Sequence, residues 1–156
     1  MSEEKKVPAD VKQALNRLVT IWSDGEGYRQ AAALAESHSH LLPKSVTHAQ
    51  LNGLRNIVGV APDAKTVKMF TDNQRDKAHR RDDLEMRDYW AEVGTALARL
   101  SESVQVLWAE AGGEEVELSN KEAKAARAQL HVRLMRAFVQ HLVAHSLYLP
   151  ATEGGS

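Results

Sequence analysis

The 156-residue sequence contains no cysteine. This absence excludes disulfide bonds, metal sites built on thiolates and a cysteine nucleophile, and it is compatible with the reducing cytoplasm, where we expect the protein to reside. No run of about 18 apolar residues is present, so we expect no membrane-spanning helix. The first ten residues, MSEEKKVPAD, lack the apolar stretch of a secretory signal, and we expect no such signal.

The sequence also lacks the alternation of apolar and polar residues that is typical of strands, and it has no runs rich in Val, Ile and Thr. Nucleophile-elbow motifs and phosphate-binding loops are absent as well. The composition, with 43% apolar and 26% charged residues, suits a globular domain with one sizeable core. These observations predict an all-α protein, and we expect no cofactor.

Apolar residues at spacings of three and four predict helices along most of the chain. The predicted helices cover roughly residues 8–24, 26–40, 48–58, 63–80, 83–111 and 119–148. They form a predicted single-domain bundle of five or six helices over residues 8–149, with the two long C-terminal helices antiparallel and with flexible ends at 1–7 and 150–156.

Start and stop signals separate these helices. Thr47 with Gln50 and Ser119 with Glu122 form capping-box patterns, and Asp63 is placed to cap the helix that follows it. The helix ends are predicted from Ser23, Asp24 and Gly25, from Pro43, from Gly59 with Pro62, and from Gly112 with Gly113.

The last helix is apolar around more of its circumference than an ordinary surface helix. Its apolar residues are Leu130, Val132, Leu134, Met135, Phe138, Val139, Leu142, Val143 and Leu147. Two explanations stay open: this helix is the centre of the bundle, or it packs on a second subunit. The three tryptophans, Trp22, Trp90 and Trp108, lie on apolar stripes and are predicted to be core residues.

The formal net charge is only −1, but the charge is unevenly distributed. Residues 65–81 hold six Lys/Arg against two acids, residues 82–118 hold two against ten, and residues 119–136 hold five against one. One interpretation is that solvated helix faces neutralise each other across the bundle. The other is that a basic stripe binds a polyanion while the acidic stretch faces away or meets another subunit.

Histidine is the residue type that most suggests metal chemistry. His141 and His145 are spaced i, i+4, which places two imidazoles on one helix face, the arrangement needed to share one metal ion. Further ligands could come from His38, His40, His48 and His131. No Glu lies between the pair, however, so the zinc-protease pattern is missing, and hydrogen-bonded or surface histidines are the simpler interpretation.

The stretch RAFVQH, from Arg136 to His141, resembles the Arg-x4-His motif of helical ribonuclease toxins of the HEPN superfamily. The resemblance implies that Arg136 holds a phosphate and that His141 moves a proton during attack by a ribose 2′-hydroxyl. Two features depart from it. Ala137 stands where that superfamily usually has a polar residue, and in an unbroken helix the two side chains diverge by about 140°.

Two polar and basic stretches are candidates for nucleic-acid binding. QLNGLRN supplies Gln50, Asn52, Arg55 and Asn56, and NQRDKAHRR supplies Asn73, Gln74, Arg75, Lys77, Arg80 and Arg81. Amide and guanidinium groups hydrogen-bond phosphate and ribose without reading bases. The alternative for both stretches is an ordinary solvated helix surface.

Two segments resemble the small helical subunits of type III CRISPR effector complexes. VTHAQLNGLRNIV, residues 46–58, is similar to their Thr-x-x-Gln-(Leu/Ile)-Arg helix, and AFVQHLVAHSLYL, residues 137–149, is similar to their last helix. Asn52 and Gly53 interrupt the first motif, and Ala144 replaces an aromatic residue in the second.

The resemblance implies a non-enzymatic subunit that lies along an RNA or RNA–DNA duplex backbone and contacts neighbouring protein subunits, with Gln50 and Arg55 touching the nucleic acid. Arg75, Lys77, Arg80 and Arg81 join this set from charge alone. This is our first functional hypothesis. The alternatives are a ribonuclease using Arg136 and His141, and a self-associating helical adaptor.

Overall fold

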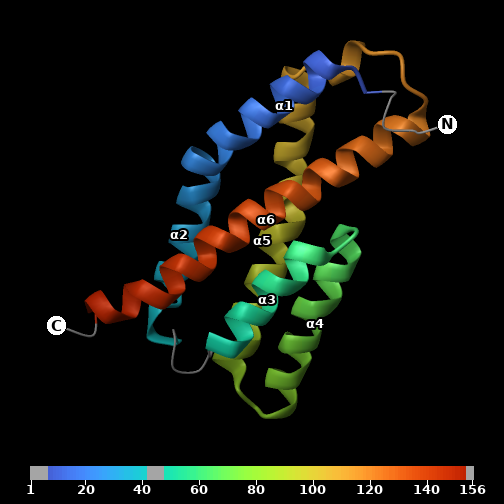
Figure 1. Cartoon of the computed structure of the whole chain (residues 1–156). Helices are drawn as coiled ribbons and strands as arrows, with labels where there is room; N and C mark the ends of the chain where they lie inside the picture. The colour runs from blue at the N-terminus through green and yellow to red at the C-terminus, as the bar shows by residue number, and fades with distance from the viewer. Residues whose placement is uncertain (1–6, 42–47, 154–156) are drawn as a thin grey trace.

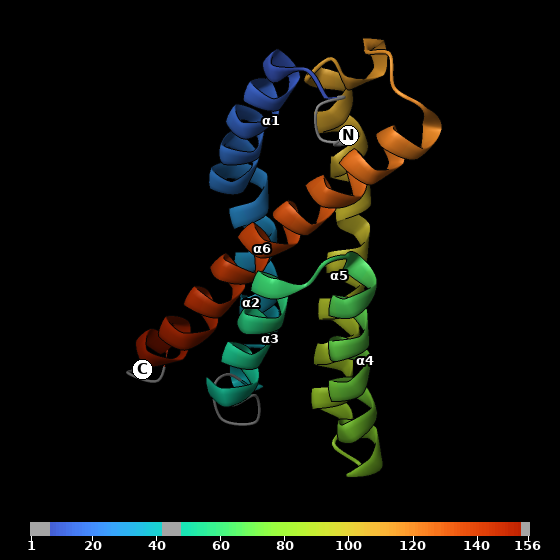
Figure 2. The same ribbon diagram turned by 45° about the vertical axis from the view of Figure 1, so that its right-hand side comes forward.

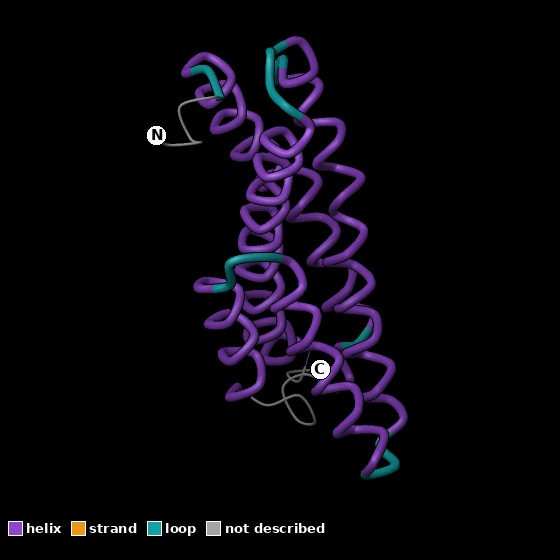
Figure 3. The backbone as a smooth tube through the Cα atoms, turned by 90° about the vertical axis from the view of Figure 1, so that its right-hand side faces the viewer, coloured by secondary structure: helices purple, strands orange, loops and turns teal. Residues whose placement is uncertain are grey.

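The computed structural model describes residues 7–41 and 48–153, and in that part every regular element is helical (Figure 3). The prediction of an all-α, single-domain bundle is confirmed. In chain order the elements are α1 (Ala9–Trp22), a π-helical turn (Ser23–Gly27), α2 (Tyr28–Ser37), a 3₁₀ turn (Ser39–Leu41), α3 (His48–Val60), α4 (Ala64–Arg80), α5 (Leu84–Glu110), a second 3₁₀ turn (Gly113–Glu115) and α6 (Asn120–Glu153).

The sequence predicted that the first helix ends at Ser23–Gly25. In the structure the helix continues through these residues. The backbone of Ser23, Gly27 and Tyr28 keeps right-handed helical dihedral angles, so α1 runs through the π-turn into α2. A π-turn inserts one extra residue into the helical repeat. The buried positions accordingly shift from the α1 series ending at Trp22 to a series that begins at Gly27 and continues through Ala31, Leu34 and Ala35. The insertion keeps both halves of this helical arm facing the core.

Gly27, the last residue of the π-turn, packs against the ring of Trp22, which directly precedes the turn. A Cβ atom on Gly27 would lie 2.7 Å from Cζ3 of Trp22, closer than carbon atoms approach. The two glycines of the SDGEG stretch therefore mislead a prediction based on helix-breaking residues, because here one of them makes room for an aromatic ring inside a helix.

α3 and α4 form a hairpin that packs on α5 through α4 (Figure 1). Asp63 caps α4 as predicted, accepting a 3.0 Å hydrogen bond from the Thr66 amide. The turn into α5 places Asp82 at a positive φ of 57°, a conformation that Asp tolerates better than most residues, and Asp83 then caps α5 by accepting from the Met86 amide. The predicted cap at Thr47 and the break at Pro43 lie outside the described residues.

α6 is the central helix of the bundle. It crosses the molecule obliquely, antiparallel to α5 as predicted, and contacts α2, α3 and α5 (Figures 1 and 2). Eight of the apolar positions named above are buried, from Leu130 to Val143. Its unusual apolar circumference is thus explained within one chain, because neighbours surround it on several sides.

The boundaries of α6 agree with the sequence at one end only. The predicted capping box is present: the Glu122 amide donates to Ser119 Oγ at 3.1 Å, and the Ser119 amide donates to Glu122 Oε1 at 2.9 Å. At the other end the helix runs on to Glu153, past Pro150, where the sequence predicted a tail from residue 150. All three tryptophans are buried as predicted, with Trp90 fully inaccessible.

Candidate nucleic-acid interface

A groove lies on the surface between α1 and the first turns of α6. Away from the π-turn these two helices diverge, and the end of α5 lies beneath the wedge between them (Figures 1 and 2). The groove has a volume of about 650 Å³. Its lining residues are Val7, Lys12, Leu15, Asn16, Trp108, Ser119, Lys121, Glu122, Ala125, Ala126, Gln129, Leu130 and Arg133.

Apolar side chains form the floor of this groove, and cations stand around it. Leu15, Trp108 and Leu130 are buried beneath it. Trp108 packs directly against the backbone of Gly113, where a Cβ atom would collide with the indole ring. The groove therefore has a rigid base made by the close packing of the α5 terminus.

Arg133 is the most informative residue of the groove. It is half-buried, and burial together with the neighbouring charge of Arg136 lowers the pKa of its guanidinium from the ordinary value. Among the residues that the structure describes, Arg133 has no hydrogen-bond or ion-pair partner. A partly desolvated cation beside a second cation is unfavourable unless an anion joins it.

Two lysines add to the positive charge around Arg133. Lys12 comes from α1 and Lys121 from the first turn of α6, and both are exposed and unpaired within the described part of the chain. Among the described lining residues the one carboxylate, that of Glu122, is engaged in the capping box. The described lining thus holds three cations, together with one acid whose oxygen already accepts a hydrogen bond.

The residues predicted on the α3–α4 hairpin are placed differently. Gln50 is half-buried, and its amide donates to Gln74 Oε1 at 3.2 Å, so this residue ties α3 to α4. Arg55 is exposed and has no partner among the described residues. Of the two contacts that the resemblance implies, only Arg55 stands free on the surface.

The cations of α4 are partly neutralised by acids on the same helix. Arg75 lies 3.4 Å from Asp72 and 3.2 Å from Asp76, and Asp72 also pairs with Lys68 at 2.7 Å. Arg81 donates a long 3.8 Å bond to the sulfur of Met86. Lys77 and Arg80 are exposed and unpaired within residues 48–153. Charge at the hairpin is therefore solvated or matched locally.

Arg136 and His141 do not converge on one site. The Arg136 guanidinium donates from Nε to the Val58 carbonyl of α3 at 3.1 Å, whereas His141 Nε2 lies 3.1 Å from Ser23 Oγ in the π-turn. The two side chains hold α6 to different neighbours, so their arrangement in one chain does not favour the ribonuclease alternative.

His141 and His145 share a helix face as predicted, but an aromatic ring stands against both. The ring of Tyr28, at the start of α2, lies 5.4 Å from that of His141 and 5.1 Å from that of His145. His131 is used elsewhere, 2.9 Å from the Leu97 carbonyl. No group of three or more metal-ligating side chains occurs within the described residues.

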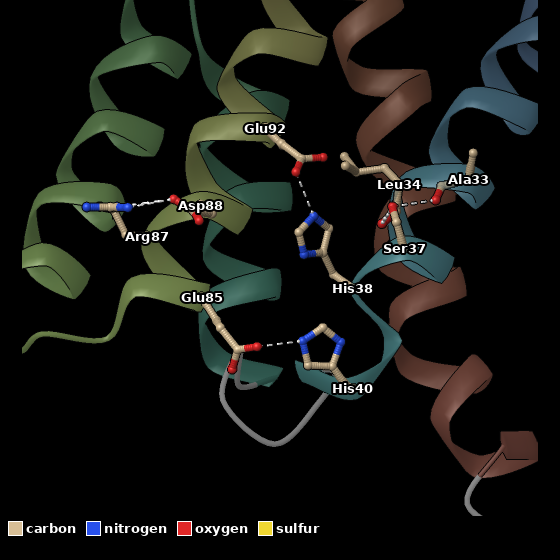
Figure 4. A network of polar contacts seen from close by, with 9 residues as sticks. All are labelled: Ala33, Leu34, Ser37, His38, His40, Glu85, Arg87, Asp88 and Glu92. Carbon is tan, nitrogen blue, oxygen red and sulfur yellow. Dashed lines mark hydrogen bonds and ion pairs between the residues drawn. The ribbon is translucent and has the colours of Figure 1, made fainter.

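Two further histidines, one directly after α2 and one in the 3₁₀ turn that follows, reach the acidic helix α5 (Figure 4). His40 Nε2 lies 3.1 Å from Glu85, and His38 Nε2 lies 3.2 Å from Glu92, close enough for an ion pair but not aligned for a hydrogen bond. These contacts tie the two helices together. They also give Glu85 and Glu92, two acids of the stretch 82–118, partners within the chain.

Among the described residues, the interior holds a few polar side-chain atoms, including the hydroxyl groups of Tyr89 and Ser146. Burial raises the pKa of the Tyr89 hydroxyl, an effect that the nearby Ser146 hydroxyl opposes, so Tyr89 stays neutral. Neither oxygen has an aligned hydrogen-bond partner in the described structure. The ring of Tyr89 packs edge-on against His38 and Trp90 at 5.2 Å. This cluster contributes to the core.

Sequence reasoning missed Lys12, Lys121 and Arg133 as a group. The signal available was the second basic block, residues 119–136, which has the same net charge as the block at 65–81. Lys12 could not be added to it, because no pattern in the sequence indicates that α1 lies beside the start of α6.

Within the described residues, no helix has the length and apolar character needed to cross a lipid bilayer. Comparisons of the chain with models of protein families, with curated proteins and with solved structures found no significant match.

Proposed function

We propose that the chain is a non-enzymatic helical subunit of a ribonucleoprotein, and that it binds the phosphate backbone of RNA in the groove between α1 and α6. The observation that carries the proposal is the half-buried Arg133, which has no counter-ion among the described residues and stands beside Lys12 and Lys121. Type III CRISPR effector complexes are the proposed setting, because residues 46–58 and 137–149 resemble their small subunits.

A phosphate group supplies the anion that the described residues of this groove do not offer to Arg133. Its oxygens accept two parallel hydrogen bonds from a guanidinium, and its charge would offset both the burial of Arg133 and the repulsion from Arg136. Lys12 and Lys121 stand on the two sides of the groove and serve as point charges for adjacent phosphates. Contacts of this kind are independent of sequence and depend strongly on salt.

The hairpin is a secondary surface in this proposal. Arg55, Lys77 and Arg80 are free to meet a backbone that extends beyond the groove, whereas Gln50 acts by holding α3 on α4. The net charge of −1 supports a subunit that joins its complex partly through protein contacts.

Fluorescence anisotropy with a labelled RNA over a salt series tests the proposal. Each phosphate contact to a single strand contributes a slope of about 0.7 in a plot of log affinity against log salt. Arg133→Gln should therefore weaken binding about fivefold at about 0.1 M salt and reduce the slope by about 0.7. Arg75→Gln is the matched control, because its charge is already paired with Asp72 and Asp76, and it should change affinity less than twofold, a small effect at about 0.4 kcal/mol.

Two outcomes would contradict the proposal. One is the absence of RNA binding at low salt, both for the isolated protein and in the presence of partner subunits. The other is an equal loss of affinity in Arg133→Gln and Arg75→Gln, which would mean that only total charge matters. A protein that binds an acidic polypeptide with the same dependence on Arg133, but not RNA, would be an adaptor instead.

A further inference from the structure

We infer that the groove accepts a single strand, and that the aromatic ring of Tyr28 at the narrow end of the wedge stacks on one of its bases. The inference rests on the proposed function, because it names the form of nucleic acid that the same site takes. It stands on three observations: the course of one ridge along α6, the exposed ring of Tyr28, and the contact of the preceding π-turn with His141 through Ser23.

The cationic groove and Tyr28 lie along one ridge of α6. Residues four apart on a helix form a continuous ridge, and here that ridge comprises Ala125, Gln129, Arg133, Ala137, His141 and His145. Its first three members line the groove, and its last two contact the ring of Tyr28. The ridge thus joins the residues that line the groove to the residues that contact the aromatic ring.

The length of this path suits a short single strand. Arg133 and His141 are eight residues apart, which corresponds to about 12 Å along the helix at about 1.5 Å per residue. At about 3.4 Å per stacked nucleotide, that distance spans about three or four nucleotides. A phosphate held at Arg133 therefore places a base of the same strand within reach of Tyr28.

Tyr28 has the properties of a stacking platform. It is 44% exposed although it lies in the middle of a helical arm. The imidazoles of His141 and His145 support its ring at 5.4 Å and 5.1 Å, and His141 is in turn held by Ser23 of the π-turn. A ring held by its neighbours loses little entropy when a base stacks on it, and stacking on aromatic side chains is tolerant of sequence.

A duplex does not offer the same contacts, because its bases are already stacked and paired. Ring and cation can be satisfied together only by a strand whose bases are free. The chemistry of the site therefore favours single-stranded RNA over double-stranded RNA, and it assigns Tyr28 a contribution that comes from bases rather than from phosphates.

The experiment compares labelled oligouridine of about 12 nucleotides, a length within the site sizes of single-strand binders, with an abasic oligomer of equal length and charge. The full-length wild-type protein should bind oligouridine about tenfold more tightly than the abasic oligomer. Tyr28→Ala should remove this preference while leaving abasic affinity unchanged, and Tyr28→Phe should restore it. Ile21→Ala is the matched control, since Ile21 is also an exposed apolar residue on this arm but has no aromatic ring on which a base could stack.

Each outcome distinguishes the inference from the proposed function. If Tyr28→Ala binds oligouridine as the wild type does, or loses affinity for both oligomers equally with a lowered melting temperature, the stacking role is wrong. The proposed function then still stands, provided that Arg133→Gln weakens binding to both oligomers. If the wild type binds neither oligomer at low salt, both ideas fail.

Discussion

The two basic regions of this molecule have the same net charge, but they differ in how far their cations are paired or buried. Residues 65–81 and 119–136 each carry a net charge of +4. On the α3–α4 hairpin, Arg75 and Lys68 are paired with Asp72 and Asp76, and the other cations are solvated. In the α1–α6 groove, Arg133 is half-buried without a partner in the described chain.

The difference teaches that net charge alone does not locate an anion site. An exposed ion pair contributes little to stability, and a solvated cation has water as its ligand, so neither needs an external anion. A partly desolvated and unpaired guanidinium has lost part of its hydration without compensation. Perturbed groups of this kind gather at functional sites, which is why we place the phosphate contact in the groove.

The largest expected effect comes from reversing charge in each region separately. The triple variant Lys12→Glu, Lys121→Glu, Arg133→Glu removes the three proposed phosphate contacts from the groove. At about 0.1 M salt, three contacts with slopes of about 0.7 each correspond to roughly a hundredfold loss of RNA affinity. Anisotropy titrations at several salt concentrations would measure both the loss and a slope lower by about 2.

The matched variant Arg55→Glu, Lys77→Glu, Arg80→Glu makes the same change in total charge on the hairpin. It should weaken binding by less than about tenfold, because these residues act through long-range attraction that salt screens. Equal losses from both triple variants would remove the distinction between the two regions. A greater loss from the hairpin variant would return the interface to the site predicted from sequence.

A second prediction compares the helical arm α1–α2 with the hairpin through two glycines. Gly27→Ala should destabilise the protein by about 2 kcal/mol, since the new methyl group meets the Trp22 ring at 2.7 Å and must force it aside. Gly59→Ala, in α3, should stabilise it by about 0.5–1 kcal/mol, because alanine is the better helix former. A methyl group there meets no described atom within 4 Å.

Urea denaturation of both variants, followed by tryptophan fluorescence, measures the two free energies of unfolding. Each variant is the control for the other, because the same substitution in two helical segments should change the free energy of unfolding in opposite directions. If Gly27→Ala were as stable as Gly59→Ala, the arm would tolerate an ordinary α-helical turn at Ser23–Gly27, and the packing described for Trp22 would be wrong.

Sequence was sufficient for features set by local chemistry. The capping box at Ser119 and Glu122, the cap at Asp63 and the burial of Trp90 follow from residues close in the chain or from helical periodicity, and all are present. The π-turn was not predictable in this way, because its glycine is required by contact with Trp22 and would otherwise indicate a helix end.

The groove was beyond sequence reasoning for a different reason. Its cations come from two helices more than 100 residues apart in the chain, Lys12 on one side and Lys121 with Arg133 on the other. Neither their proximity nor the half-burial of Arg133 leaves a periodic signal. The amides of QLNGLRN drew attention to the hairpin instead, although Gln50 bonds Gln74 within the molecule.

A third prediction concerns the start of α6, which forms one wall of the groove. Ser119→Ala should destabilise the protein by about 1 kcal/mol, because the Glu122 amide loses the hydroxyl that accepts from it. Ser101→Ala, at an exposed position inside α5, is the matched control and should be neutral or slightly stabilising. Chemical denaturation measures both, and equal stabilities would mean that packing on α5, and not the cap, fixes this wall.

The smallest expected effect is on stability, and it compares Arg133 in the groove with Arg75 on the hairpin. Arg133→Met keeps most of the side-chain volume and removes an unpaired, half-buried charge beside Arg136, so it should stabilise the free protein by about 0.5 kcal/mol. Arg75→Met loses exposed ion pairs and should be neutral or destabilising by less than about 0.5 kcal/mol. Denaturation in low salt measures both values, since screening would reduce the repulsion between Arg133 and Arg136. If Arg133→Met makes the protein more stable while RNA affinity falls, Arg133 is retained for binding, because packing alone would favour its replacement. If Arg133→Met destabilises the protein, the aliphatic stem of Arg133 supports the groove wall instead.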